Sequence, residues 1–438
     1  MRLLYLHQHY SGPGGATATA TRAHAMARAL AARGHDVTLA CGRYEGAETG
    51  LGGPFRAGRR EGRGAGFRIV EFDIPCSNAQ GLAARSAAFL RYAGRATALA
   101  VKGRFDLLLA SSTPLTVALP ALAAHRLRGL PFVFEIRDPW PELPRALSEA
   151  HGAGVPAPIL AVLDRLATAA CRDAAAVIGL TEGMAETALA RGADPARTHA
   201  VPNGCDLDLF GPQIAPWRPA EAASWEVLAV YAGAHGRANG LDAAIEAATL
   251  LQQQGERRLR LVLVGEGSER RRLMEEAARR GLHNLTFLDP LPKPRLAGLL
   301  AGSGIGLHLL APIPAFAEWT APNKLMDYLA AGLPVVTNTP GRAARLVEAD
   351  GDAPACGLAA PPGDAPALAG ALAALAADPA RRAAMGAAAR ARAVRLWDRR
   401  LHAARFCEIL EAAATSPRVP ALHPEREGSP EEHLQAFR

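Results

Sequence analysis

Short apolar runs alternate with longer stretches of helical period along the first half of the chain. The apolar runs that predict strands are 3–6, 35–40, 67–72, 106–110, 131–136 and 175–180. Helical patterns lie between them at about 16–33, 82–102, 115–128 and 157–173. This alternation favours βαβ units around a parallel sheet.

The same pattern restarts in the second half. Predicted strands lie at 225–233, 259–267, 285–289 and 304–310, and predicted helices at about 240–254, 268–281, 293–302, 363–377 and 380–413. The segment 205–224 contains Pro and Gly and has no period, which indicates a linker. We therefore predict two open α/β domains, 1–204 and 225–413, joined by 205–224 and followed by a Pro- and Glu-rich tail, 414–438. In such a pair a ligand is expected between the domains, at the carboxyl ends of the strands.

Composition agrees with a globular protein of two domains. The chain has 438 residues, of which 49% are hydrophobic and 21% charged. The net charge of +7 comes mostly from arginine and suits anionic partners, although a genome rich in Arg and Ala codons would explain it equally well. No apolar run approaches the roughly 20 residues of a membrane span, and no secretory signal opens the chain, so we expect a cytoplasmic protein.

Several classes of site are excluded by their missing motifs. The six cysteines are scattered without a CxxC pair, so neither a zinc site nor a disulfide framework is indicated. The sequence also lacks a cluster of carboxylates of the kind that binds a metal ion. Aromatic residues make up 5% of the chain and no nucleic-acid-binding motif occurs, which excludes a nucleic-acid partner.

A Gly-rich turn, GPGG (12–15), follows the first predicted strand and opens a helix. The backbone of Gly14 and Gly15 could approach an anion there, at the positive end of the helix dipole. The turn is not a dinucleotide fingerprint, because Thr17 takes the place of the third glycine. A plain tight turn is the alternative.

The segment FEIRDPWPE (134–142) places Glu135, Arg137 and Asp138 at the end of the strand predicted for 131–136. Polar groups just past a strand's carboxyl end are where an α/β protein carries its chemistry. The alternative is a surface ion pair of Arg137 with Asp138 or Glu142.

Two further Gly-rich turns follow strands of the second domain. YAGAHGRANGLD (231–242) contains Gly233 and Arg237, and LVGEGSER (263–270) contains Glu266 between two glycines. Each turn is weak evidence alone. Because both follow strands of one domain, they predict one polar rim in which Arg237 could meet a phosphate.

The segment TAPNKLMDYLAAGLPVVTN (320–338) crowds Asn323, Lys324 and Asp327 into the start of a short helix. Asn323 and Asp327 are four residues apart and therefore share a helical face. Helix capping explains one such polar residue but not three.

Together these motifs, with VPNGCD (201–206), resemble those of the family 4 glycosyltransferases, which have the GT-B fold of two facing Rossmann-like domains. The likeness extends to about residue 410 and is greatest for the branch that transfers amino sugars in O-antigen and capsule assembly. It rests above all on APNKLMDYLAAGLPVV (321–336).

The resemblance implies a retaining, metal-independent transfer, without a cofactor, from a UDP-sugar to a hydroxyl group. The sugar would be an N-acetylated amino sugar, and the acceptor a glycan or a polyprenyl-linked glycan. By the same resemblance, Asp327 would bind the ribose hydroxyls, Asn323 and Lys324 would hold the sugar and diphosphate, and Gly14 and Gly15 would close over the diphosphate.

This chain lacks two basic residues that the family usually has in its second domain. Where the family has an Arg and a Lys after the first strand of the second domain, alignment through the following glycine gives Ala234 and Asn239. Trp319 takes the place of the first Glu of the family's Glu-x7-Glu pair. Lys324 and Arg237 are the available substitutes for the missing cations.

We therefore expect Lys324, Arg237 and the helix start beside them to stabilise charge on the leaving phosphate. Many family members carry a His where this chain has Arg137 and Asp138. Either Asp138 or Glu135 is expected to orient the acceptor hydroxyl.

The stretch 82–104 mixes basic and apolar residues, as a helix on the inner face of the cell membrane would. An ordinary half-buried helix explains it equally well. Three other functions stay open: a glycosyltransferase for small natural products, an NDP-sugar epimerase, and a non-catalytic sugar-nucleotide-binding partner.

Overall fold

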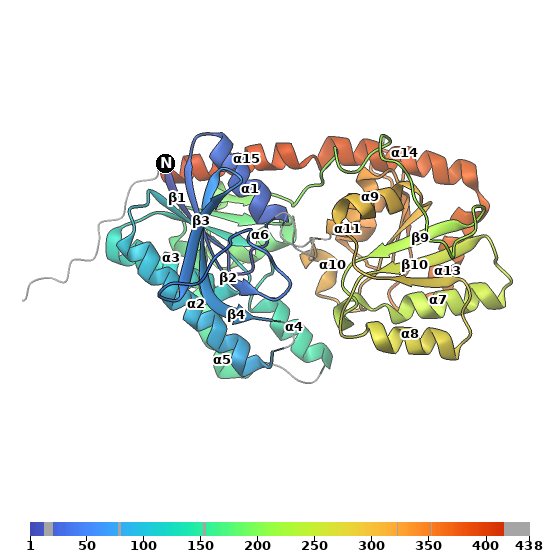
Figure 1. The fold of residues 1–438 in the computed structure, drawn as a ribbon, viewed down its shortest axis with the longest axis horizontal. Helices are drawn as coiled ribbons and strands as arrows, with labels where there is room; N and C mark the ends of the chain where they lie inside the picture. Colours follow the sequence, from blue (N-terminus) through green and yellow to red (C-terminus); the bar gives the residue numbers. More distant parts are fainter. Residues whose placement is uncertain (13–20, 78–79, 152–154, 322, 352, 416–438) are drawn as a thin grey trace, which may run out of the picture.

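The computed structural model describes residues 1–438 except 13–20, 78–79, 152–154, 322, 352 and 416–438. Two α/β domains lie side by side, each around its own sheet (Figure 1). Gly14 and Gly15, which we predicted to contact an anion, lie outside the described residues. Most of the predicted tail lies outside them as well.

The first sheet has eight strands in the order β3-β4-β2-β1-β5-β6-β7-β8. All neighbours pair in parallel except β3 and β4, which are antiparallel. The strands are β1 Arg2–Leu6, β2 Asp36–Tyr44, β3 Arg59–Gly64, β4 Phe67–Cys76, β5 Leu107–Ser111, β6 Phe132–Ile136, β7 Ala176–Gly179 and β8 Thr198–Ala200. The interior strands read as continuous apolar runs because helices cover both faces of the sheet. The sequence missed β3, an edge strand of Arg, Glu and Gly that buries neither face.

Helices on both faces of this sheet form two apolar cores. One core contains residues of α2, α3, α5 and α6, and the other contains residues of α1 and α15. The helices of this part of the chain are α1 Thr21–Ala32, α2 Leu82–Lys102, α3 Ala118–Arg128, α4 Glu142–His151, α5 Ala157–Asp173 and α6 Glu182–Ala190. Short 3₁₀ turns lie at Leu115–Val117 and Pro195–Arg197.

The second sheet is parallel throughout, in the order β11-β10-β9-β12-β13-β14. This is the strand order of a doubly wound nucleotide-binding fold. Its strands are β9 Val227–Ala232, β10 Leu259–Val264, β11 Leu285–Leu288, β12 Ile305–His308, β13 Val335–Thr337 and β14 Gly357–Ala359. The prediction of two Rossmann-like α/β domains is confirmed.

The remaining helices follow these strands. They are α7 Asp242–Gln253, α8 Arg270–Arg279, α9 Lys293–Ala301, α10 Phe316–Trp319, α11 Asn323–Ala330, α12 Arg342–Val347, α13 Ala365–Ala377, α14 Pro379–Leu396 and α15 Arg399–Ala414. A 3₁₀ turn, Arg237–Asn239, precedes α7. None of the helices in the described segments is long and apolar enough to cross a lipid bilayer.

The helix predicted for 380–413 is two helices, and the second belongs to the first domain. Asp398 begins α15 by accepting a hydrogen bond from the backbone N–H of Arg400. Figure 1 shows α15 passing back over the first sheet, where Phe406 and Leu410 are fully buried. Our limit of 225–413 for the second domain was therefore wrong at its end, because apolar periodicity does not say which sheet a helix covers.

The chain crosses between the domains at two adjacent places. Cys205, at the start of the predicted linker, pairs with Asp398 in a parallel bridge. The N–H of Cys205 donates to Trp397 O at 2.7 Å, and the N–H of Arg399 donates to Cys205 O at 3.0 Å. The two crossings are thus one hydrogen-bonded connection.

We predict that Phe406→Ala lowers the free energy of unfolding by about 3 kcal/mol, because it opens a cavity under α15. Leu401→Ala is the matched control on the same helix, since Leu401 is 59% exposed, and it should change stability by less than about 0.5 kcal/mol. Urea denaturation followed by circular dichroism measures both. Equal effects of the two variants would show that α15 does not anchor the first domain.

Candidate active site

The N-terminal turn of α11 brings Lys324 against the loop after β9. The Lys324 ammonium donates to the Tyr231 hydroxyl at 2.8 Å and to the Asn239 Oδ1 at 3.1 Å, and it lies 4.2 Å from the centre of the Tyr231 ring. Gly233 makes room for it, since a Cβ there would lie 3.1 Å from the Lys324 Nζ. Burial lowers the pKa of Lys324 to about 7. Within the described residues, no carboxylate forms an ion pair with this ammonium.

Asp327, one turn further along α11, is buried and faces a different neighbour. Its Oδ2 lies 3.3 Å from the Lys293 Nζ at the start of α9. Burial raises the pKa of Asp327, and Lys293 opposes that rise. Asn323, in the first turn of α11, is exposed. The three polar residues predicted at this helix start therefore have different surroundings.

Glycines let the loops after β9 and β10 pack backbone against backbone. Gly267 has a φ of +156°, and a Cβ there would lie 2.5 Å from the carbonyl oxygen of His235. A Cβ at Gly265 would overlap the carbonyl oxygen of Gly233. The N–H of His235 donates to Glu266 O at 2.8 Å, which holds the two loops together. The rim predicted from the two Gly-rich turns exists for this steric reason.

The side chains of this rim do not all converge. Glu266 is largely exposed, with Oε2 3.7 Å from the Nε of Arg270. Arg237 is 82% exposed and lies 3.5 Å from Glu269. The structure therefore does not bring Arg237 to Lys324, and it leaves Lys324 as the cation beside Asn239.

In the first domain, Glu135 is fully buried and its carboxylate is already bonded on both oxygens. Its Oε1 accepts from the guanidinium of Arg22, with N–O distances of 2.8 and 2.9 Å, and its Oε2 accepts from the Ser111 hydroxyl at 2.5 Å. Arg22 also donates to Pro202 O at 2.7 Å. The expectation that Glu135 orients an acceptor hydroxyl was wrong, because this carboxylate is inaccessible and ties α1 to β6.

Arg137 and Asp138 lie at the carboxyl end of β6, as predicted, but they do not pair with each other. The Arg137 guanidinium donates to the His7 Nε2 at 2.9 Å, and Asp138 accepts from the Thr113 hydroxyl at 2.5 Å. Burial, with Arg137 next in importance, holds the pKa of His7 well below its ordinary value, so His7 is the neutral acceptor. Glu142, the other proposed partner, bonds to a different arginine. The surface ion-pair interpretation is not supported.

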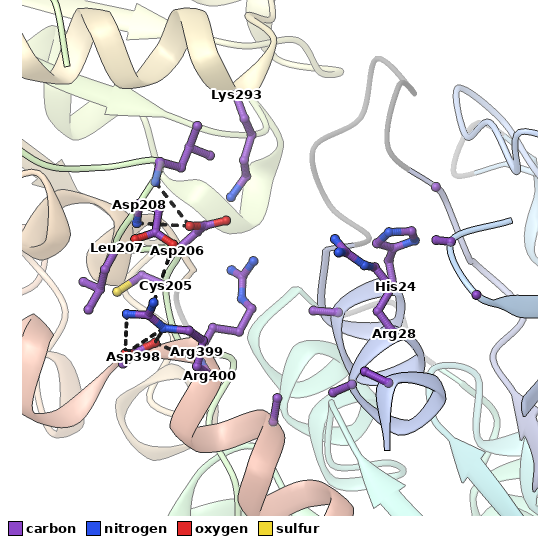
Figure 2. A pocket seen from close by; sticks show the side chains of 18 of the residues that line it. His24, Arg28, Cys205, Asp206, Leu207, Asp208, Lys293, Asp398, Arg399 and Arg400 are labelled. Atoms are coloured by element: carbon purple, nitrogen blue, oxygen red, sulfur yellow. Dashed lines mark hydrogen bonds and ion pairs between the residues drawn. The ribbon is translucent and has the colours of Figure 1, made fainter. Parts of the chain in front are cut away.

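A cavity of about 1420 Å³ lies between α1, the loops around the crossing, and α9. In Figure 2, His24 and Arg28 of α1 lie on one side of it, and the 205–208 segment, Lys293 and Arg399 lie on the other. Gly12, at the start of the Gly-rich turn, also lines it. The sequence identified none of the cavity's charged side chains: Arg28, Arg33, Asp206, Asp208, Lys293, Asp398, Arg399 and Arg400. Asp206 lies in the VPNGCD motif, but neither the motifs nor the local periodicity marks any of these side chains as lining a cavity.

Each domain matches a family model. Residues 17–204 match the model described as "Glycosyl transferase 4-like domain", and residues 226–378 match "Glycosyl transferases group 1". One curated relative, D-inositol 3-phosphate glycosyltransferase of Kribbella flavida, is 32% identical over 209 residues. That alignment covers 45% of this chain and 47% of the relative, so the chain matches about half the length of this protein.

Solved structures of other proteins share the fold over nearly their whole length. Sucrose-phosphate synthase from Thermosynechococcus elongatus has a TM-score of 0.73 at 18% identity, with 94% of this chain and 98% of that chain covered. Anabaena Alr3699/HepE in complex with UDP-glucose has a TM-score of 0.62 at 19% identity, with 94% of this chain and 100% of that chain covered. WaaG, a glycosyltransferase of lipopolysaccharide biosynthesis, has a TM-score of 0.65 at 18% identity, with 93% of this chain and 99% of that chain covered. At these identities the structures establish the GT-B fold.

We predict that Glu135→Gln destabilises the protein by about 3 kcal/mol, because it leaves the Arg22 charge buried without its counterion. Asp73→Asn is the control: it removes an equally short but exposed ion pair, Arg43–Asp73 at 2.7 Å, and should cost less than about 1 kcal/mol. Thermal unfolding measures the difference. If Glu135→Gln is as mild as Asp73→Asn, the buried pair is not the structural tie described above.

Proposed function

Since the chain consists of a glycosyl transferase 4-like domain and a group 1 glycosyl transferase domain in a GT-B fold, we propose that it transfers a sugar from a nucleotide-sugar donor to an acceptor hydroxyl. The observation that carries the proposal is the Lys324 ammonium. It is held by two neutral oxygens beside the start of a helix, at the carboxyl ends of β9 and β12. A half-buried lysine without a carboxylate partner, beside the positive end of a helix dipole, suits a diphosphate, whose negative charge would raise its lowered pKa and keep it protonated.

We propose a UDP-sugar as the donor, and an N-acetylated amino sugar as the transferred group. UDP is supported by the Alr3699/HepE structures, which contain UDP or UDP-glucose, and the amino sugar by the resemblance of the motifs alone. Asp327 binds the ribose hydroxyls, Asn323 faces the sugar, and the rim at Gly233 and Glu266 borders the diphosphate.

In the proposed mechanism the configuration at the anomeric carbon is retained. The acceptor oxygen bonds to that carbon on the face from which the diphosphate leaves, and a phosphate oxygen of the leaving group takes the hydroxyl proton. Lys324 and the start of α11 stabilise the negative charge that develops on the diphosphate. This neutralisation makes a metal ion unnecessary. Asp138 is the carboxylate that remains to orient the acceptor hydroxyl, with Arg137 beside it.

Lys324 also weighs against a non-catalytic role. That alternative rested on the missing family cations, since Asn239 and Ala234 stand where an Lys and an Arg are usual. The Lys324 Nζ lies 3.1 Å from the Asn239 side chain, so an ammonium reaches the region of the missing lysine from another helix. We infer that Lys324 takes the place of the family's lysine: it comes from a different position in the sequence, but its side chain reaches the same region of the fold.

We propose a lipid-linked glycan as the acceptor, presented at the inner face of the membrane. One face of α2 packs on the sheet through Phe89 and Tyr92, as an ordinary half-buried helix does. Its other face exposes Leu82 and Leu90. The exposed arginines at 91 and 95 on the same helix would suit anionic lipid headgroups.

The proposed function is tested by measuring release of UDP from UDP-sugars with three kinds of acceptor: a polyprenyl-diphosphate-linked sugar, a small aglycone, or none. We expect release that depends on the lipid-linked acceptor, that is unchanged by EDTA, and that gives a product of retained anomeric configuration by NMR. Conversion of donor without acceptor would indicate an epimerase. Transfer to the small aglycone alone would indicate a natural-product enzyme, and binding without turnover a non-catalytic partner.

We predict that Lys324→Met lowers kcat/KM by about 100-fold, because it removes a group that stabilises charge in the transition state. Adding Asn239→Lys to that variant should restore at least about tenfold, since the new ammonium would lie in the same region. Arg271→Met is the control, because Arg271 is a cation of the same domain that is 93% exposed. Steady-state kinetics with a fixed acceptor measures all three variants. Near-normal turnover by Lys324→Met would remove Lys324 from the mechanism.

A further inference from the structure

Lys293 is a charged residue of the cavity that no sequence motif indicates. It is the first residue of α9, directly after Pro292, and its side chain is 17% exposed at the cavity wall. The Nζ lies 3.3 Å from the Asp327 Oδ2 and 5.5 Å from the centre of the Phe210 ring. A cation at the first position of a helix is opposed by the helix dipole. Its position is therefore explained by Asp327 and Phe210 rather than by α9 itself.

Asp327 keeps one oxygen for another partner. Lys293 bonds to Oδ2, and no hydrogen bond to Oδ1 is found within the described part of the chain. Lys293 lines the cavity, and the Asp327 side chain, which is 10% exposed, lies behind it. A buried carboxylate with a free oxygen is suited to accept a hydrogen bond from a ligand hydroxyl.

We propose that Lys293 is a positioning residue for the donor: from the cavity wall it holds the neighbouring Asp327 carboxylate in the orientation that accepts hydrogen bonds from the ribose 2′- and 3′-hydroxyls. This inference rests on the proposed function, in which Asp327 binds the ribose, and adds the residue that makes Asp327 fit for that role. A vicinal diol presents two hydroxyl donors on one side of the ring. An ionised carboxylate can accept hydrogen bonds from both, whereas a protonated carboxyl carries a donor of its own and has less capacity to accept.

The charges around Asp327 agree with this role. Burial raises the pKa of Asp327, and Lys293 is the largest influence that lowers it, followed by Arg399 of α15. Asp206, in the segment after β8, raises it further, and the buried thiol of Cys205 lies in the same surroundings. Without Lys293 the pKa of Asp327 would rise again, so a larger fraction would be protonated as the pH falls. The loss of binding on removing Lys293 should therefore be greatest at low pH.

The test compares two probes that differ only in the diol, UDP and 2′,3′-dideoxy-UDP, by isothermal titration calorimetry on the full chain. We expect the wild type to prefer UDP by about tenfold or more, the value of hydrogen bonds to a charged acceptor. Lys293→Met should weaken UDP binding by about tenfold, change dideoxy-UDP binding by less than twofold, and lose further UDP affinity as the pH is lowered. Lys293→Arg should keep most of the preference, and Lys102→Met, a lysine on the exposed face of α2, should change nothing.

The outcomes separate this inference from the proposed function. If the wild type does not bind UDP, the proposed function fails and the role of Lys293 with it. If the wild type prefers UDP and Lys293→Met keeps the same preference and pH dependence, only the inference is overturned. If Lys293→Met does not fold, the Lys293→Met/Asp327→Asn variant removes both charges; it should bind the two probes equally, and a wild-type preference there would overturn the inference.

Discussion

The second domain is organised around the Lys324 side chain, which lies half-buried against neutral oxygens of Tyr231 and Asn239 rather than against a carboxylate. An uncompensated charge in such a place is costly, so other parts of the domain must hold it there. α11 supplies the lysine, β9 supplies the tyrosine, and Gly233 leaves the space. The close packing of the loops after β9 and β10, which only glycine allows at Gly265 and Gly267, fixes that space.

The first domain contains a compensated charge as well as one like Lys324. Glu135 is bonded to Arg22 and Ser111, and this buried group ties α1 to β6. Arg137 at the end of β6 is held by the neutral His7, so it resembles Lys324 in having a neutral partner rather than a carboxylate.

The double crossing between the domains determines what lines the cavity. Because α15 returns to the first domain beside Cys205, residues distant in sequence, such as Arg28, Lys293 and Arg399, lie around one space. Lys293 lies at its wall, with its ion-pair partner Asp327 behind it. A change in the angle between the domains would alter this cavity directly, since its walls belong to both of them.

The sequence by itself determined the two α/β domains, nearly all the strands, and the positions of the glycines and polar residues at strand ends. It could do so because a strand that is buried on both faces of its sheet must be a continuous apolar run, and such a run is visible in the sequence. It missed the edge strands β3 and β14, the helices α4 and α6, and the destination of α15, whose pattern is the same on either sheet. Only the tertiary structure decided three contacts: Lys324 donates to Asn239, Lys293 pairs with Asp327, and the Glu135 carboxylate is buried against Arg22 and Ser111. Those pairs join residues 24 to 113 positions apart, and packing rather than local periodicity chooses such partners.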